Sequence, residues 1–191
     1  MRIIVGITGA TGAPLAIMLL QMLKSIPEVE THLIISRWGK ATIELETPYQ
    51  ARDVIGLADF YHSSADQGAT ISSGSFLTEG MIIIPCSMKT LAGIRSGYAD
   101  GLIGRAADVV LKEKRKLILV PRETPLSTIH LENMLALSKM GASIIPPMPA
   151  WYNHPKDLND ITHHIASRIL DQFSLKFPET KRWDGLKESS R

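Results

Sequence analysis

The residues Arg2-Ile3-Ile4-Val5-Gly6-Ile7, followed by Thr8-Gly9-Ala10-Thr11-Gly12 and then Ala13-Pro14, decide the fold of this chain. The first segment is a short apolar run rich in β-branched residues, which predicts a buried strand. The second segment is a tight glycine loop. Proline near the start of the next apolar-periodic segment suits the first turn of a helix, where its missing N–H costs nothing. The stretch therefore predicts a strand, a loop and a helix in immediate succession.

The glycine loop is a candidate anion site. A loop of this kind brings free backbone N–H groups and the positive end of a helix to one point. The spacing of Gly6, Gly9 and Gly12 differs from the dinucleotide fingerprint, which has two glycines one residue apart near its start. From the loop alone, an anion cradle and an ordinary strand-to-helix turn both remain open.

Composition limits the class of protein. A chain of 191 residues with 45% hydrophobic residues can bury one large core, which fits a single α/β domain. The single cysteine, Cys86, excludes a disulfide within the chain and fits a reducing, cytoplasmic compartment. The formal net charge of +2 argues against a nucleic-acid binder, although a local cluster of cations could still hold a small phosphorylated ligand. We expect no signal peptide and no membrane span, because the first apolar run is short and contains glycine.

Strand and helix signals alternate along the rest of the chain. Apolar runs predict further strands at residues 31–36, 81–87, 116–120 and 143–145. Apolar periodicity and end signals predict helices at residues 14–25, 38–46, 89–95, 101–114, 129–140 and from about residue 157, with Gly141 as a left-handed cap. The least regular part, residues 50–80, predicts a short helix and loops over the site. The alternation predicts a parallel sheet with helices on both faces, in one domain over residues 1–175 with a tail over residues 176–191.

Polar residues follow each predicted strand, at the edge of the sheet where such folds bind their ligands. They are Thr8, Gly9 and Thr11, then Ser36 and Arg37, then Cys86, Ser87, Lys89 and Thr90, then Arg122 and Glu123, and finally Trp151, Tyr152 and His154. Hydroxyls, backbone amides and cations thus converge on one edge. This set predicts a phosphate-bearing, aromatic ligand rather than a metal or a sugar.

Several candidates have a structural interpretation beside the functional one. Cys86 could be a nucleophile, but a lone cysteine at the end of a buried strand is more typical of a core residue. Ser87 and Thr90 could bind phosphate, cap a helix, or do both. Arg105 and Lys112 share one face of a predicted helix, where they could reach one anion together or form a solvated charged face.

The carboxylates and the remaining arginine leave similar alternatives open. Glu123 could pair with an arginine or act as a general acid or base. Glu46 ends a predicted helix, where the helix dipole disfavours a carboxylate, and this favours a functional reason for its presence. Arg168 lies at the edge of an apolar stripe, where a long side chain commonly extends to water. The histidines lack the spacing of metal ligands, and we expect no metal site.

Several blocks of the sequence closely resemble the UbiX family of flavin prenyltransferases. They are Gly6–Gly12 (GITGATG), Pro85–Leu91, Arg105–Val109, Leu111–Glu113, Pro121–Leu126, His130–Met134 and Pro149–Tyr152. The resemblance runs from the first strand to about Arg168 with the blocks in the same order. It implies a flavodoxin-like, Rossmann-like doubly wound sheet and a homo-oligomer, typically a trimer-based dodecamer.

The resemblance also implies an activity. Such an enzyme joins a dimethylallyl group from dimethylallyl phosphate to N5 and then C6 of reduced FMN, without a metal. The product, prenylated FMN, would be the cofactor of a partner UbiD-type aromatic acid decarboxylase. Two alternatives remain: a non-catalytic FMN-binding carrier subunit, and an oxidative decarboxylase of cysteine-containing peptides, to which some related flavoproteins belong.

The site residues implied by the resemblance fall into three groups. FMN would contact Gly9, Ala10, Thr11, Ser36, Ser87, Met88, Lys89, Thr90, Arg105 and Arg122. The prenyl phosphate would lie among Lys112, Arg122, Tyr152 and Arg168, some of them supplied by a neighbouring subunit. Thr11, Glu46 and Glu123 would be the catalytic groups near the reacting flavin edge, and Trp183 would be an aromatic lid.

Overall fold

The computed structural model describes residues 1–177 and 179–185, and within them six strands form one parallel sheet. The strands are β1 (Arg2–Ile7), β2 (Glu30–Ile35), β3 (Phe60–Ser63), β4 (Gly80–Cys86), β5 (Lys116–Pro121) and β6 (Ser143–Ile144). The helices are α1 (Ala13–Lys24), α2 (Arg37–Glu46), α3 (Ala51–Ile55), α4 (Met88–Ser96), α5 (Leu102–Lys112), α6 (Thr128–Lys139) and α7 (Leu158–Leu170), with short 3-10 turns at Thr70–Ser72 and Asp171–Phe173.

The strand order is β3-β2-β1-β4-β5-β6, so the direction of winding reverses between β1 and β4. Ligands bind at such a reversal, beyond the carboxyl ends of the strands. The predicted doubly wound parallel sheet is confirmed, and β2-β1-β4-β5-β6 by itself has the flavodoxin-like order. The prediction of only a short helix and loops over residues 50–80 was wrong in one respect, because β3 lies there. This four-residue edge strand is mostly exposed and carries no apolar run.

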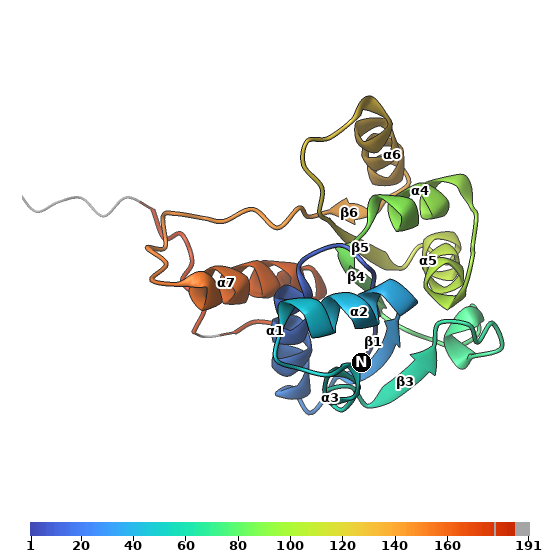
Figure 1. Cartoon of the computed structure of the whole chain (residues 1–191), viewed down its shortest axis with the longest axis horizontal. Coiled ribbons are helices and arrows are strands. Elements are labelled where there is room, and N and C mark those ends of the chain that lie inside the picture. The colour runs from blue at the N-terminus through green and yellow to red at the C-terminus, as the bar shows by residue number, and fades with distance from the viewer. Residues whose placement is uncertain (178, 186–191) are drawn as a thin grey trace, which may run out of the picture.

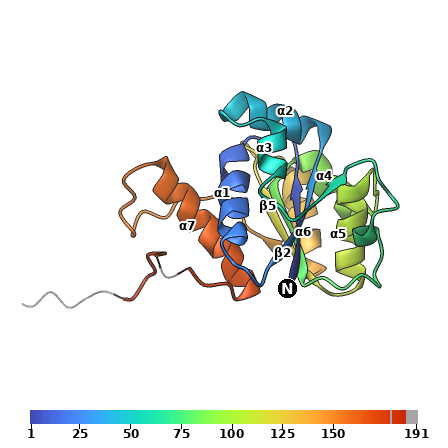
Figure 2. The same cartoon turned by 90° about the horizontal axis from the view of Figure 1, so that it is seen from below.

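Successive side chains of the central strands point to opposite faces of the sheet and pack into two separate hydrophobic cores. Ile3, Val5 and Ile7 of β1 pack with α1 and α7, whereas Ile4 packs with α4, α5 and α6 on the opposite face. Figures 1 and 2 show these two helical layers on either side of the sheet. Because both faces are covered, β1 and β4 are buried along nearly their whole length, as continuous apolar runs predict.

Helix ends follow the predicted signals. Asp157 begins α7 by accepting a hydrogen bond from the amide of Asp160 at 2.9 Å. Gly141 follows α6 with φ +100°, the left-handed region that glycine adopts without strain. Over the described residues, we find no helix whose length and apolar character would allow it to cross a bilayer.

Candidate active site

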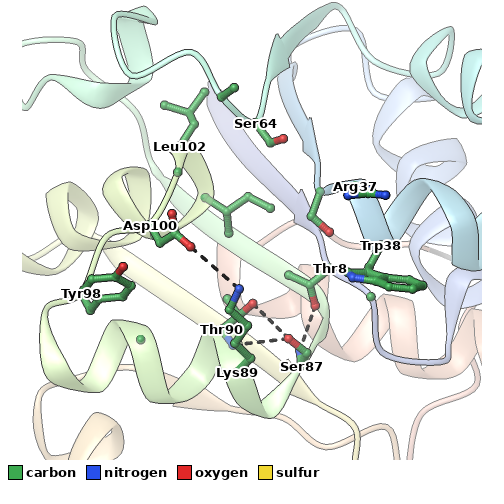
Figure 3. Close-up of a pocket in the computed structure, with 17 residues that line it drawn as sticks. Thr8, Arg37, Trp38, Ser64, Ser87, Lys89, Thr90, Tyr98, Asp100 and Leu102 are labelled. Carbon is green, nitrogen blue, oxygen red and sulfur yellow. Dashed lines mark hydrogen bonds and ion pairs between the residues drawn. The ribbon is translucent and has the colours of Figure 1, made fainter.

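A cavity of about 530 Å³ opens where the sheet reverses its winding, at the carboxyl ends of β1, β2 and β4. Its walls come from the loops and first turns that follow these strands and from the start of α5 (Figure 3). Most polar groups that line it are hydroxyls, namely those of Thr8, Ser36, Ser64, Ser87, Thr90 and Tyr98. The volume is in the range of ordinary cofactor and substrate pockets.

The first turn of α4 forms one wall of this cavity and is tied to the end of β1. Ser87 caps α4 by accepting a hydrogen bond from the amide of Thr90 at 3.3 Å, and the two hydroxyls lie 3.0 Å apart. The amide of Ser87 donates to Thr8 Oγ1 at 2.8 Å, and that hydroxyl donates to the carbonyl of Pro85 at 2.7 Å. Thr8 thus fixes the α4 N-terminus against β1, as Figure 3 shows.

Two further helices present their N-termini to the same cavity. Ser36 caps α2 by accepting a hydrogen bond from the amide of Gly39 at 3.0 Å. The start of α5 has no side-chain cap, because Gly101 stands there with φ +91°. The amide of Leu102 donates instead to the carbonyl of Ser64 at 2.9 Å. Three helix N-termini at one cavity create a positive potential that suits a phosphate group.

Cations and aromatic rings complete the walls. Arg37 and Lys89 line the cavity, and Lys89 Nζ lies 3.8 Å from a carboxylate oxygen of Asp100. Trp38 and Tyr98 also line it, and both are exposed, at 72% and 68%. Exposed aromatic side chains beside a cavity offer flat apolar surface to a ring-shaped ligand.

The glycine loop is only partly open to this cavity. Gly9 lines it, whereas Ala10 and Thr11 do not. Gly9 allows a close approach to α2, because a Cβ atom there would overlap the Trp38 side chain. At the far end of the loop, Glu46 Oε2 accepts hydrogen bonds from the amides of Gly12 and Ala13, both at 2.9 Å. The chain's own carboxylate therefore occupies the N-terminus of α1.

Tyr152 and Arg168 belong to a second cluster, formed by α7 and the segments before and after it. The Tyr152 ring contacts the rings of His164 and Trp183 edge-to-face, with centroids 5.8 and 5.7 Å apart. Arg168 Nη1 donates to Asp171 Oδ2 at 2.9 Å. Burial, and then the charge of Arg168, lowers the pKa of His164, so this ring is neutral at pH 7. The structure thus brings Tyr152 and Arg168 onto one side of α7.

Arg122 and Glu123 follow β5 and are exposed. The amide of Arg122 donates to the carbonyl of Cys86 at 3.3 Å, so its backbone lies beside the start of α4, where Met88 is the first helical residue. Glu123 Oε1 accepts a hydrogen bond from the amide of Thr124 at 3.1 Å. Cys86 itself is fully buried, and this burial raises the pKa of its thiol to about 12. The interpretation of Cys86 as a core residue is confirmed.

Arg105 and Lys112 lie apart from the cavity within one chain. Arg105 Nε donates to the carbonyl of Ser72 at 3.1 Å, and its Nη1 donates to Asp108 at 2.9 Å. Lys112 forms an ion pair with Glu113 at the C-terminal end of α5. The N-terminal end of α5 lines the cavity as far as Gly104, and the eight rises of about 1.5 Å from there place Lys112 about 12 Å farther along the helix.

Part of the cavity wall was not predicted from the sequence. Ser64, Tyr98, Asp100 and the range 101–104 line the cavity but follow no predicted strand. Gly101 and Gly104, at the start of a predicted helix, were the available signal, since glycine there permits close backbone approach. Across the described residues, we find no group of three or more His, Cys, Asp or Glu side chains placed to hold a metal ion.

Comparison with known proteins places the chain in a family. The family model described as Flavoprotein matches residues 1–170. A probable UbiX-like flavin prenyltransferase of Escherichia coli O157:H7 is 70% identical over 189 residues, which cover 99% of this chain and 96% of that protein. The chain belongs to the UbiX-like flavin prenyltransferase family.

Two solved structures of UbiX proteins share this architecture. The dodecameric FMN-dependent UbiX-like decarboxylase from Escherichia coli O157:H7 has a TM-score of 0.96 and 71% identity, covering 97% of this chain and 100% of that one. AnUbiX in complex with FMN and dimethylallyl pyrophosphate has a TM-score of 0.95 and 51% identity, covering 97% of this chain and 98% of that one. The flavodoxin-like fold implied by the sequence resemblance is therefore confirmed.

Proposed function

We propose that this UbiX-like protein transfers a dimethylallyl group from dimethylallyl phosphate to reduced FMN and releases prenylated FMN. The observation that carries the proposal is the cavity at the reversal point of the sheet, where three helix N-termini meet hydroxyls and two cations. Such a site suits the phosphate of a flavin mononucleotide, and the exposed rings of Trp38 and Tyr98 suit a flat heterocycle.

FMN would be held by groups from three loops. Gly9 of the first loop, Ser36 at the start of α2, and Ser87, Lys89 and Thr90 at the start of α4 all line the cavity. Ala10 and Met88 stand next to lining residues in the chain, and the backbone of Arg122 lies beside the α4 N-terminus. We propose that these three residues, together with Thr11 of the glycine loop, extend the FMN site. Arg105 would reach the ligand only by leaving Ser72 and Asp108.

The prenyl phosphate would bind through Arg122, Tyr152 and Arg168. The C–O bond to phosphate would break as the allyl carbon bonds to N5 of the reduced flavin, which loses its proton. The alkene of the N5-bound group would then take up a proton, and its tertiary carbon would bond to C6 as C6 loses its own proton. Guanidinium and phenol donors stabilise the negative charge that grows on the departing phosphate. Tyr152 and Trp183 present aromatic surface to the allyl fragment while it is cationic. Glu123 or the released phosphate would accept the proton that the flavin loses.

Lys112 would complete this site from another subunit. Within one chain it lies at the opposite end of α5 from the cavity, so it can serve a prenyl phosphate only across a subunit interface. We therefore propose a homo-oligomer, and the dodecamer of the Escherichia coli relative is the expected form. A UbiD-type decarboxylase would receive the product, and both proteins would act in the cytoplasm. We also propose the division into a domain of residues 1–175 and a C-terminal segment of residues 176–191, of which residues 178 and 186–191 lie outside the described residues.

The test is an anaerobic incubation of the purified protein with reduced FMN and dimethylallyl phosphate, without added metal, followed by the mass of the bound flavin. The same incubation without the prenyl phosphate is the control, and a parallel reaction with the diphosphate compares the two donors. A mass gain of one dimethylallyl unit supports the transferase. A flavin that stays bound with unchanged mass would instead support the carrier subunit.

A further inference from the structure

Residues 180–183 connect α7 to the segment that carries Tyr152. Thr180 Oγ1 donates a hydrogen bond to Ser167 Oγ of α7 at 2.7 Å, in a buried contact. Three residues later, the Trp183 ring meets the Tyr152 ring edge-to-face. Two separate contacts therefore fix this segment beside the proposed prenyl phosphate site, with Arg182 between them.

Arg182 shares one carboxylate with Arg168. Its Nη1 and Nη2 donate to the two oxygens of Asp171 at 2.8 and 2.7 Å, the bidentate geometry that gives arginine its strongest carboxylate contacts. Arg168 donates to Asp171 Oδ2 at 2.9 Å. The Asp171 side chain is only 16% exposed, and hydrogen bonding to Arg182 lowers the pKa of its carboxyl group, so it is ionised at pH 7.

The charges of this trio leave one net positive charge at the C-terminal end of α7. If Arg182 were absent, Asp171 would pair with Arg168 alone, and the two charges would cancel. An incoming phosphate would then have to compete with a carboxylate for the same guanidinium. Arg182 holds both carboxylate oxygens and balances the charge of Asp171. The positive charge of Arg168, and its donors other than the Nη1 that contacts Asp171, therefore remain available to a second anion.

We infer that Arg182 is a positioning residue of the prenyl phosphate site, which neutralises Asp171 so that Arg168 can bind the phosphate. This inference rests on the proposed function, because it assigns the phosphate to Arg168. Arg182 acts through Asp171 and does not itself touch the substrate. The role of Arg182 is thus electrostatic, and it differs from a purely structural role of holding the C-terminal segment in place.

The variants Arg182→Ala and Arg182→Ala/Asp171→Asn test this role. We expect Arg182→Ala to raise the KM for dimethylallyl phosphate about tenfold, the effect of weakening one charged hydrogen bond, while the affinity for FMN is unchanged. Removing the Asp171 charge in the double variant should return the KM to within about threefold of wild type. Lys176→Ala removes another exposed charge from the C-terminal segment and is the matched control.

Three outcomes decide the inference. A raised KM in Arg182→Ala that the double variant reverses supports it. A wild-type KM in Arg182→Ala overturns it. A raised KM that the added Asp171→Asn substitution fails to reverse also overturns it, because Arg182 would then act only by holding the C-terminal segment in place. If wild-type protein forms no prenylated FMN, the proposed function fails. The inference about Arg182 is then decided by calorimetric titration with dimethylallyl phosphate. It is supported if wild type binds dimethylallyl phosphate more tightly than Arg182→Ala does, and overturned otherwise.

Discussion

Glu46 Oε2 lies 2.9 Å from the backbone nitrogen of Gly12 and accepts a hydrogen bond from it, across 34 residues of sequence. Gly12 stands at the N-cap position of α1 with φ +122° and has no side chain to cap the helix itself. A carboxylate from the end of α2 therefore satisfies amides at the positive end of α1. This contact fixes the glycine loop against α2, the helix that carries Trp38 into the cavity.

Glu46→Ala should lower the free energy of unfolding by about 1–2 kcal/mol, the usual effect of removing a helix cap. Glu46→Gln keeps an oxygen acceptor but not the negative charge, and its free energy of unfolding should fall by less. Urea denaturation measures both, and Glu44→Ala, at an exposed position of the same helix, is the control. If Glu46→Ala proved as stable as Glu44→Ala, the carboxylate would have no capping role, and only its proposed catalytic one would remain.

Glu46 stands out in the sequence, but its hydrogen-bond partner does not. The position was suspect because a carboxylate at the end of its own helix is unfavourable. The reason for it lies in another helix, and no local pattern connects residue 46 with residue 12. The N-caps Ser36, Ser87 and Asp157 were predictable because each acts within its own helix. The strand order, the wall at residues 101–104 and the Asp171–Arg182 pair depend on tertiary packing, which a single sequence does not encode locally.

Ser87→Ala should weaken FMN binding without removing it. The hydroxyl caps α4 and lines the cavity, so its loss removes one donor for the phosphate and loosens the helix N-terminus. We expect the dissociation constant for FMN to rise about tenfold, as measured by fluorescence titration. Ser138→Ala removes an exposed hydroxyl from α6, a helix that contributes no residue to the cavity lining, and is the control. Equal FMN affinity in the two variants would remove Ser87 from the proposed site.

Arg168→Ala should raise the KM for dimethylallyl phosphate roughly ten- to a hundredfold and leave FMN binding nearly intact, because its charge is assigned to the phosphate. Steady-state kinetics and FMN titration on the same samples separate the two effects. Arg95→Ala removes an exposed arginine from the last turn of α4 and serves as the matched control. Equal losses of FMN and prenyl phosphate binding would refute the assignment.

A subunit-mixing experiment tests whether Lys112 serves a neighbouring site. Lys112→Ala and Arg168→Ala oligomers should each be impaired with dimethylallyl phosphate. The two variants are dissociated, mixed in equal amounts and reassembled. Some sites then combine an intact Lys112 from one chain with an intact Arg168 from another. Because each of these two chains is the required one in about half of the cases, about a quarter of the sites should recover activity under random mixing. Each variant taken alone through the same procedure is the control. No recovery in active-size oligomers would mean that both residues act from one chain.

The buried His32 and the half-buried His62 form a pair that links β2 to β3. His32 is 3% exposed, its Nδ1 lies 3.0 Å from His62 Nε2, and its Nε2 lies 2.9 Å from Glu30. Burial, followed by the charge of His32, lowers the pKa of His62, while Asp66 opposes this shift. The strand held by this pair leads directly into Ser64 and the cavity wall.

The folded protein should therefore lose stability as the pH falls from about 6.5 through the lowered pKa of His62, because the unfolded chain binds the proton more readily. Above about pH 6.5 the contribution is fully present. We expect the melting temperature to fall between pH 7.5 and 5.0, and to fall less in His62→Gln, whose amide donates to His32 without titrating. The pKa of His164 is also lowered, but His164 is present in both proteins, so its contribution to the pH dependence cancels in the comparison. Identical pH profiles for wild type and His62→Gln would show that the pair does not link proton binding to folding.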